Sequence, residues 1–559
     1  MGRAACKDSY HDPIDPCIAV PLYLEEPLMP FICGYKFRGI QEYIARGGRL
    51  KDIAGGSELI DSLCRTRLAG LLGAMGIGAL DKNGVPSLNS GHGHVLQADS
   101  GRILVEFADK ANAEQFTRLW PLVANQWAPH GRHAIALREA TDSNIADTVR
   151  SIYGQIEGGP ELPLMALPLS SPLTRRDPRT GLPVTRVAPY PGNTEYFDAS
   201  GSRRNMVLGQ QDGESLKNRF GFGNDDKISL EMDEIADAGD SDLLAVVHAD
   251  GTGFGDRFRQ VLKRPKGIEA GVELSALTRS LFRDAATVAL NPLRDVRTTA
   301  GDIACRPILL GGDDMTILVP GRFGWQVARC FLDTLEKASR TELPVFAKKY
   351  NLEGPEWQCL YAGAGIAFVH AHYPFDLALR LADTCARWAK DRLKKHEMAN
   401  RTSCLQFHVA LDSATDDFDQ IFEQQLVKRD DSGTTKELTA GPYVTTAVFD
   451  SRFATLDQLD ALVRAVAALP RRGWREVSRL IHESDVSADR RLRRQVDLLN
   501  ESQRTGVEAA LQAFGKANTI WSEGPSKQLR TPVQDVDVLV GLLQRFDQTD
   551  GEERGLSNV

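Results

Sequence analysis

Apolar residues near the N-terminus follow the periods of a strand, helices, a hairpin, a helix and a strand. A strand is predicted at 31–37, and apolar residues at helical spacing follow over 38–72. Two alternating apolar runs at 93–108 flank a short polar turn, which is typical of a β-hairpin. A helix over 111–128 and a strand over 133–139 complete a βαββαβ unit.

The same order of elements returns further along the chain. The predicted elements are a strand at 242–250, helices at 256–262 and 271–293, a hairpin at 308–320, a helix at 324–340, a strand at 360–374 and a helix at 375–395. The pattern therefore predicts an α+β protein with two ferredoxin-like (palm) βαββαβ domains plus a helical C-terminal domain.

The pattern divides the chain into five predicted segments. They are a flexible N-terminal tail (1–28), a degenerate first palm-like domain (29–158), a Pro-rich linker and helical connection (159–240), a second palm domain (241–412) and a helical C-terminal domain (413–559). Eight prolines fall between 160 and 191, a density that predicts no regular element there.

Composition narrows the class of protein. Of the 559 residues, 42% are hydrophobic and 25% are charged, as in globular proteins that are soluble in water. No apolar run reaches the length of a membrane span, and no secretory signal is evident, so we expect a cytoplasmic protein without a membrane partner. The 9 cysteines form no CxxC, which favours neither a zinc ribbon nor a disulfide framework. A net charge of −8 argues against a protein that coats nucleic acid, and RRLRRQ at 490–495 is more typical of a solvated helix face.

The hairpin at 308–320 carries Gly311-Gly312-Asp313-Asp314 at its tip. Gly and Asp are ordinary turn residues, so a turn without chemistry is one interpretation. The other is a metal site, because in a βαββαβ sheet the first strand ends beside this turn, which brings Asp250 to both aspartates. Three converging carboxylates repel one another unless cations lie between them, and oxygen ligands suit Mg²⁺ or Mn²⁺. Two such ions would serve an in-line phosphoryl transfer, although the four residues by themselves favour the turn.

A glycine-rich bend follows Asp250. Gly251, Gly253 and Gly255 lack the Cβ atoms that would keep phosphates away from backbone N–H groups. The string is neither a P-loop nor a dinucleotide fingerprint, so by itself it is a weak signal. Lys390, near the end of the last helix, is placed to reach a triphosphate, although an exposed lysine at a helix end is an equally good interpretation.

Three segments together resemble a known family: AVVHADGTGFG, ILLGGDDMTILVP and GAGIAFVHAHYPFDLALRLADTCARWAK. They are similar to the catalytic palm of the large subunit of type III CRISPR complexes and, more widely, to GGDEF-type nucleotidyl cyclases. The resemblance implies that Asp250 and the Gly-Gly-Asp-Asp hairpin bind two metal ions at a nucleotide site. It also implies that Lys390 binds phosphate.

The resemblance implies a nucleotidyltransferase that converts ATP into cyclic or linear oligoadenylates as an anti-phage signal. A diguanylate-type cyclase using GTP is an alternative, but the motif ends in Asp-Asp without the Glu-Phe continuation. A non-catalytic nucleotide-binding palm subunit of a CRISPR-type complex is the other alternative. The expected partners are ATP, other nucleoside triphosphates, and either a homodimer or a CRISPR-type RNA–protein complex.

The chain also departs from the family. The single His-Asp pair, His11-Asp12, sits in a polar tail rather than in an HD nuclease motif. Asp177 and Pro178 stand where a zinc-binding cysteine is expected, and the first hairpin, 98–101, lacks paired carboxylates. These departures indicate a reduced relative.

The first palm-like domain is the natural place for an acceptor nucleotide. Gly55, Gly56 and Ser57 are predicted to open a helix whose free N–H groups would bind it. Close helix packing is an equal interpretation of these small residues. The pairs His92/His94 and His370/His372 are more typical of packing or solvent contact than of metal binding.

Overall fold

The computed structural model describes residues 30–81, 84–141, 144–162, 173–190, 193–208, 215–398, 400–411, 415–429, 435–446, 453–467, 469–514, 519–526 and 528–543. The predicted tail (1–28), with His11-Asp12, lies outside these residues. The described chain combines helices with several sheets, which confirms the predicted α+β class.

Residues 30–162 form the N-terminal unit, and a connection follows it. The unit contains β1 (Phe31–Arg38), α1 (Ile40–Ala45), α2 (Leu50–Ser62), a π-helical turn (Leu63–Arg67), α3 (Leu68–Ala74), β2 (Gly78–Leu80), β3 (Pro86–Leu88), β4 (Gly93–Asp99), β5 (Arg102–Phe107), α4 (Lys110–Trp127), β6 (Arg132–Glu139) and α5 (Ile145–Gly158). The connection contains β7 (Arg186–Tyr190), β8 (Asn193–Phe197), α6 (Ala199–Leu208), α7 (Leu216–Arg219) and α8 (Met232–Asp237).

Residues 243–411 form the central unit. It contains β9 (Leu243–Gly251), α9 (Phe254–Leu262), α10 (Gly267–Ala289), a 3₁₀ turn (Asn291–Leu293), β10 (Arg306–Leu310), β11 (Asp314–Pro320), α11 (Gly321–Lys349), a second 3₁₀ turn (Pro355–Trp357), β12 (Ala362–His370), α12 (Phe375–Lys395) and β13 (Cys404–Val409).

Residues 415–543 form the C-terminal unit. It contains α13 (Phe418–Ile421), a π-helical turn (Phe422–Leu426), β14 (Val427–Arg429), β15 (Thr435–Glu437), β16 (Tyr443–Val444), α14 (Leu456–Ala467), α15 (Arg471–Leu480), α16 (Asp485–Asp497), α17 (Glu501–Phe514), β17 (Ser522–Glu523), β18 (Leu529–Arg530) and α18 (Val533–Leu543).

Two sheets share one strand order. In the N-terminal unit the order is β4-β5-β1-β6, and in the central unit it begins β10-β11-β9-β12, with all these neighbours antiparallel. In both sheets the first strand in sequence lies between the third and the fourth, which is the order of a βαββαβ unit. The central sheet continues with β13, parallel to β12, and with β16. That the two units are palm domains stays a prediction.

Helices cover both faces of the central sheet. On one face, a Cβ on Gly324 of α11 would lie 2.4 Å from Cβ of Ala245 in β9. On the other, a Cβ on Gly365 of β12 would lie 1.9 Å from the carbonyl oxygen of Ala382 in α12. Because both faces are covered, the inner strand β9 is a continuous apolar run, and residues 244–247 are fully buried.

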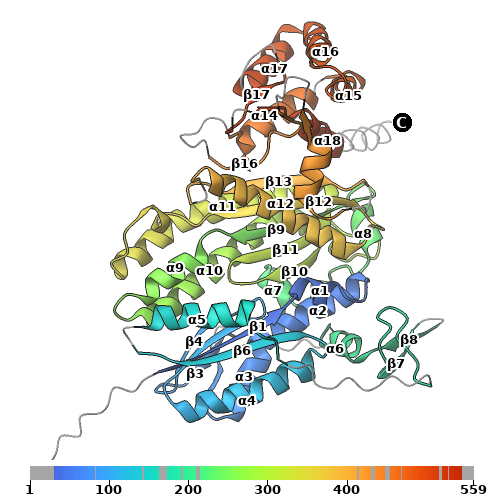
Figure 1. The fold of residues 1–559 in the computed structure, drawn as a ribbon. Helices are drawn as coiled ribbons and strands as arrows, with labels where there is room; N and C mark the ends of the chain where they lie inside the picture. Colours follow the sequence, from blue (N-terminus) through green and yellow to red (C-terminus); the bar gives the residue numbers. More distant parts are fainter. Residues whose placement is uncertain are drawn as a thin grey trace, which may run out of the picture.

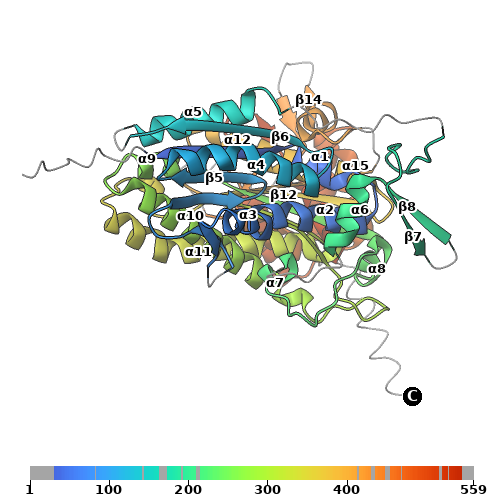
Figure 2. The same cartoon turned by 90° about the horizontal axis from the view of Figure 1, so that it is seen from below.

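The three units are stacked in chain order along the molecule, with the N-terminal unit at the bottom of Figure 1. Seen from below, helices α3 and α4 of the N-terminal unit lie in front of the central unit (Figure 2). The hairpin β7–β8 projects from the side in both views. None of the helices in the described part of the chain has both the length and the apolarity that a bilayer crossing requires.

Two expectations about regular structure are wrong. Strand β7 forms within 160–191, since its Pro189 lies in a two-stranded hairpin where a missing N–H is tolerated. The C-terminal unit is not purely helical either, because β14, β15, β18 and β17 form a small sheet. Strands of two or three residues are too short to show alternation in the sequence.

Gly365→Ala should destabilise the protein by about 1–3 kcal/mol, because an added Cβ has no room between β12 and the backbone of α12. Gly154→Ala in α5 is the matched control, since a Cβ there meets nothing within 4 Å and Ala favours a helix. Urea unfolding followed by circular dichroism measures both variants. A Gly365→Ala midpoint at or above that of wild type would contradict the close packing.

Candidate active site

The predicted carboxylates meet where β9 ends beside the central hairpin. Asp250, one residue from the end of β9, is the register partner of Asp314, which opens β11. The carbonyl of Asp313 accepts a hydrogen bond of 2.8 Å from the backbone N–H of Gly251. The antiparallel register thus brings together residues that lie about sixty positions apart in the sequence, as the βαββαβ pattern predicts.

Lys390 reaches this point from α12. Its ammonium group forms an ion pair with the carboxylate of Asp250 and lies 3.3 Å from the carbonyl oxygen of Gly251. The lysine crosses β12 over Gly363, where a Cβ would lie 2.3 Å from Cγ of Lys390. Gly363 is not among the predicted site residues, although the alternating small residues of GAGIA are a signal for a close helix.

Burial and mutual repulsion shift the pKa values of the three carboxyl groups. Removal from water, with Asp313 and Asp250 alongside, raises the pKa of Asp314 well above its ordinary value. The same removal from water and the charge of Asp250 raise the pKa of Asp313 to about 7. Although burial opposes it, the hydrogen bond with Asp314 and the ammonium of Lys390 lower the pKa of Asp250. The pKa values of neighbouring carboxyl groups are thus shifted in opposite directions.

The glycine-rich bend leads into the N-terminus of α9. Gly253 takes a left-handed conformation (φ 73°) as the N-cap residue, and no side chain caps the helix. Beneath the bend, the buried Arg257 donates 2.8 Å and 3.2 Å hydrogen bonds to the carbonyls of Glu356 and Cys359. These hydrogen bonds hold the bend in place. No side chain caps the first N–H groups of α9, and an anion site requires such unpaired N–H groups.

A cavity of about 460 Å³ lies in front of that helix end. Its basic lining residues are Arg150 of α5, Arg257 and Arg259 of α9, and Lys263, which follows α9, so both units contribute to it. Asp147, Asp256 and Glu356 line it as well. Asn400 also lines the cavity, and its Oδ1 would lie 3.0 Å from a Cβ on Gly253. The cavity thus combines basic and acidic side chains beside the start of the helix.

The two central hairpins touch each other. A Cβ on Gly311 would lie 1.7 Å from Oγ of Ser100, and one on Gly312 would lie 3.5 Å from Oδ2 of Asp99. Asp99 accepts two hydrogen bonds, of 3.1 Å and 3.0 Å, from the guanidinium of Arg279 in α10. Gly311 is therefore required by packing between the units, and a role of Gly311 and Gly312 in nucleotide binding stays a prediction.

The predicted helix start at Gly55, Gly56 and Ser57 is wrong. These residues lie buried inside α2, which begins at Leu50 because the bend falls at 47–48, where both glycines have positive φ. A Cβ on Gly55 would lie 2.6 Å from the carbonyl oxygen of Arg204 in α6. The small residues allow helices to pack closely, and their N–H groups are not free to bind an acceptor nucleotide.

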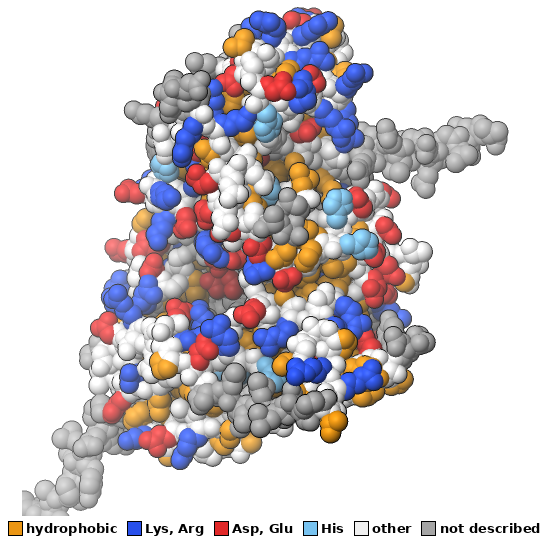
Figure 3. All heavy atoms as spheres, turned by 45° about the vertical axis from the view of Figure 1, so that its right-hand side comes forward, with side chains coloured by type: hydrophobic (Ala, Val, Ile, Leu, Met, Phe, Trp, Pro, Cys, Tyr) orange, Lys and Arg blue, Asp and Glu red, His pale blue; other side chains and the backbone are white. Residues whose placement is uncertain are grey.

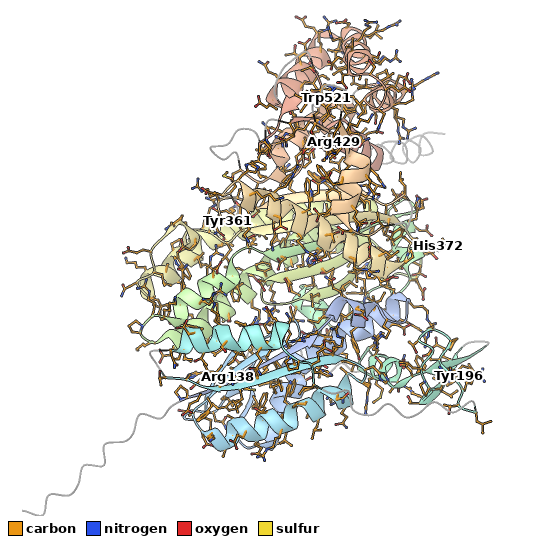
Figure 4. The ribbon with its side chains drawn as sticks, in the orientation of Figure 1. Arg138, Tyr196, Tyr361, His372, Arg429 and Trp521 are labelled. Carbon is orange, nitrogen blue, oxygen red and sulfur yellow. The ribbon has the colours of Figure 1, made fainter. Side chains whose placement is uncertain are left out.

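The histidines at the other end of β12 lie away from the carboxylates. Figure 4 labels Tyr361 and His372, which flank β12 on opposite sides of the molecule. Asp250 pairs with Gly363 at the Tyr361 end. His370 pairs with Asp242 at 3.0 Å and is more than half exposed.

The N-terminal histidine pair is split by the strand boundary. His94 lies in β4 with Nδ1 3.0 Å from Oε2 of Glu106, whereas His92 precedes the strand. Within the residues that the structure describes, no three His, Cys, Asp or Glu side chains are grouped closely enough to hold a metal ion as they stand. Metal binding by Asp250, Asp313 and Asp314 thus stays a prediction.

No family model matches the chain, and no curated protein matches it. Solved structures of Csm1 are similar to it. Csm1 of T. onnurineus is 12% identical, with 92% of this chain and 69% of that chain covered at a TM-score of 0.46. A Csm1–Csm4 cassette in complex with cA4 is 12% identical, with 92% and 70% covered at 0.43.

A Csm1–Csm4 cassette in complex with AMPPNP is 12% identical, with 65% of this chain and 53% of that chain covered at a TM-score of 0.37. The chain thus spans 53% of the Csm1 chain in the AMPPNP complex. It spans 70% of that in the cA4 complex, 71% of that in an apo Csm1–Csm4 cassette and 69% of Csm1 of T. onnurineus. The Csm1–Csm4 subcomplex of the type III-A CRISPR-Csm interference complex is also similar, at 11% identity with 92% of this chain and 70% of that chain covered and a TM-score of 0.43.

Gly311→Ala should destabilise the protein by about 1–3 kcal/mol, because the new Cβ overlaps Ser100. Ser100→Gly should restore most of that loss in the double variant, since Ser100 has a positive φ (47°) that glycine adopts freely. Gly312→Ala is the control, because its Cβ makes only ordinary contacts. Thermal unfolding of the wild type, the Gly311→Ala and Ser100→Gly single variants and the double variant measures the coupling. Purely additive effects would contradict a direct contact.

Asp313→Asn should stabilise the metal-free protein at pH 8 and leave its stability unchanged at pH 3.5. The folded protein holds the proton of Asp313 up to a pKa of about 7, against an ordinary value of 3.8, so the wild type loses stability as pH rises through this range. Asparagine keeps the shape without the charge. Urea unfolding in EDTA at both pH values tests this, and an equal effect at both would show that Asp313 is not the group concerned.

Proposed function

We propose that this protein is a nucleotidyltransferase that joins nucleoside triphosphates, ATP first among them, into cyclic or linear oligonucleotides. The observation that carries the proposal is the pairing of Asp250 with Asp314, beside Asp313, at the edge that also carries the uncapped N-terminus of α9. Carboxylates for cations and free N–H groups for phosphates are the two requirements of phosphoryl transfer. The choice of adenine rests on the motif resemblance.

The donor set fits divalent cations. Asp250, Asp313 and Asp314 supply only oxygen ligands, which Mg²⁺ and Mn²⁺ prefer. Burial and the neighbouring carboxylates raise the pKa of Asp313 and of Asp314, and a cation between them would offset the repulsion. Two bound ions would supply the neutralisation of an attacking hydroxyl and a leaving pyrophosphate. Binding them requires the ionised form of Asp314 and a Lys390 side chain that has moved away from Asp250.

The protein's own residues would position the donor. The N–H groups at the start of α9 bind the phosphates, with Arg150, Arg259 and Lys263 around the cavity to balance their charge. Lys390, once it is free of Asp250, lies close enough to the Gly251 carbonyl to contact a phosphate placed along the bend. From the motif resemblance we further infer that the chain works in a type III CRISPR-like RNA–protein complex in anti-phage defence.

Asp313→Ala combined with Asp314→Ala should abolish nucleotide joining, by at least about 10³-fold, while the fold and its stability are kept. Asp225→Ala with Asp226→Ala removes another Asp-Asp pair, from the loop before α8, and should keep wild-type activity. The assay incubates each labelled nucleoside triphosphate with Mg²⁺ or Mn²⁺ and separates the products by chromatography.

Product formation at the wild-type rate by the first double variant would refute the assignment of the site. Products from GTP alone would identify a diguanylate-type enzyme instead. Binding of a triphosphate without any product, from wild-type protein in its complete assembly, would identify a non-catalytic nucleotide-binding subunit.

A further inference from the structure

The outer strand of the central sheet is only partly covered. β13 (Cys404–Val409) pairs with β12 along its whole length, but β16 pairs only with its first two residues. The backbone N–H of Ala410 donates a 2.9 Å hydrogen bond to the carbonyl of Phe368 in β12. Because the N–H groups of successive strand residues point to opposite edges, those of Phe407 and Val409 point away from β12. The second half of β13 therefore has an open edge.

Nothing in the described part of the chain pairs with that edge. The N–H groups of Phe407 and Val409 and the carbonyl of Val409 have no hydrogen-bond partner there, whereas the carbonyl of Phe407 accepts one from the side chain of Gln406. The N–H of Gly441, which would continue the pairing of β16, instead donates a 3.1 Å hydrogen bond to Oγ1 of Thr439. An unpaired strand edge is a template for another strand.

A cavity of about 570 Å³ lies along this edge, and we call it the edge groove. Residues 406–409 all line it, although successive residues of a strand point to opposite faces. The cavity therefore follows the edge of β13 and not one face of the sheet. Its opposite wall is formed by Arg475 and Ser478 of α15 and by Val538 and Gly541 of α18. The volume is that of an ordinary binding site, and nothing in the proposed chemistry uses it.

The edge groove exposes apolar side chains. Leu411, two residues beyond the end of β13, is 88% exposed and lines the groove. Val409 of β13 and Val538 of α18 are half-buried beside it. Figure 3 shows exposed apolar side chains below the basic side chains that gather over the C-terminal helices. Apolar surface next to an unpaired strand edge favours a ligand that brings apolar side chains of its own.

Two basic side chains stand at the rim of the edge groove. Arg471 and Arg475 are exposed, and neither makes a hydrogen bond or an ion pair with the residues that the structure describes. Two acidic residues also line the groove. Asp535 is buried and accepts a hydrogen bond from the hydroxyl of Tyr443, and Asp537 lies near both guanidinium groups. Two guanidinium groups beside one available carboxyl favour a ligand that brings a further carboxylate.

The unpaired backbone groups select the class of ligand. Val409 offers an N–H and a carbonyl toward the groove, and an extended polypeptide brings the matching acceptor and donor at the repeat of a strand. A small anion would use the arginines and leave the edge unpaired. A helix keeps its own backbone groups paired and could not satisfy the edge. A second copy of this chain would have to bring its own β13, whose edge is enclosed by the same two helices.

We propose that the edge groove binds an extended segment of a partner protein, which adds a strand to the central sheet beside β13. Apolar side chains of that segment pack on Val409 and Leu411, and a carboxylate on it pairs with Arg471 and Arg475. The proposal rests on the backbone of β13 and on the side chains around it. It is therefore independent of the proposed function.

A displayed library of random twelve-residue peptides, panned against the full chain, supplies the probes, and fluorescence anisotropy measures the affinity of each selected peptide. The selected peptides should combine apolar residues with Asp or Glu. Val409→Pro removes the N–H at the open edge but keeps the hydrogen bonds to β12, and proline is tolerated on edge strands. This variant should weaken binding about tenfold or more. Val409→Thr keeps the N–H and the branched shape, so its affinity should stay within about threefold of wild type.

Methylation of single backbone nitrogens in a selected peptide tests strand addition without changing the protein. Binding should be lost at alternate positions, because every second N–H of the added strand faces β13. Arg471→Ala with Arg475→Ala should remove the preference for a peptide with Asp or Glu over the same peptide with Asn or Gln. Arg472→Ala with Arg490→Ala removes two exposed arginines that do not line the groove and should keep that preference.

Urea unfolding confirms that each variant is folded, and the methylation series decides the question if Val409→Pro is not. The proposal is overturned if the library yields no binder, if Val409→Pro and Val409→Thr bind alike, or if methylation has the same effect at every position. Sedimentation of the wild type covers the remaining occupant. A dimer that Val409→Pro dissociates would assign the groove to a second copy of the chain and overturn the assignment to a partner.

Discussion

The pairing of β9 with β11 is the constraint on which the site depends. Because successive side chains of a strand point to opposite faces, a slip of one residue would turn Asp250 away from both Asp314 and Lys390. Packing prevents such a slip. Helix α11 lies on one face of the strand and α12 on the other, and glycines bring each helix into contact with the backbone of the sheet. The buried faces therefore fix the chemistry at the end of the strand.

This register has an electrostatic consequence. It places three carboxylates together where water is scarce, beside the ammonium group of Lys390. Burial and repulsion raise the pKa of Asp314, whereas Lys390 lowers that of Asp250. A cation between the carboxylates, as the proposed function requires, would reduce this repulsion.

The N-terminal unit supports the site although its own hairpin carries no pair of carboxylates. Its turn packs on the Gly-Gly-Asp-Asp turn through Ser100, and Asp99 pairs with Arg279 behind it. Arg150 of α5 also lines the cavity at the start of α9. The two units therefore hold the same turn and share one cavity, and movement of one against the other would change both.

The sequence by itself determined the elements and their order. The span of α12 and the alternation around both hairpins depend on local periodicity, and the βαββαβ order then predicts that Asp250 lies beside Asp313 and Asp314. Only the tertiary structure determined the packing role of each of these glycines. Gly55 allows helix packing, Gly363 makes room for Lys390 and Gly311 accommodates Ser100, and the sequence shows only a glycine in each case. Periodicity reports which face of an element is buried, but it does not report what that face meets, because contacts between distant segments leave no local pattern.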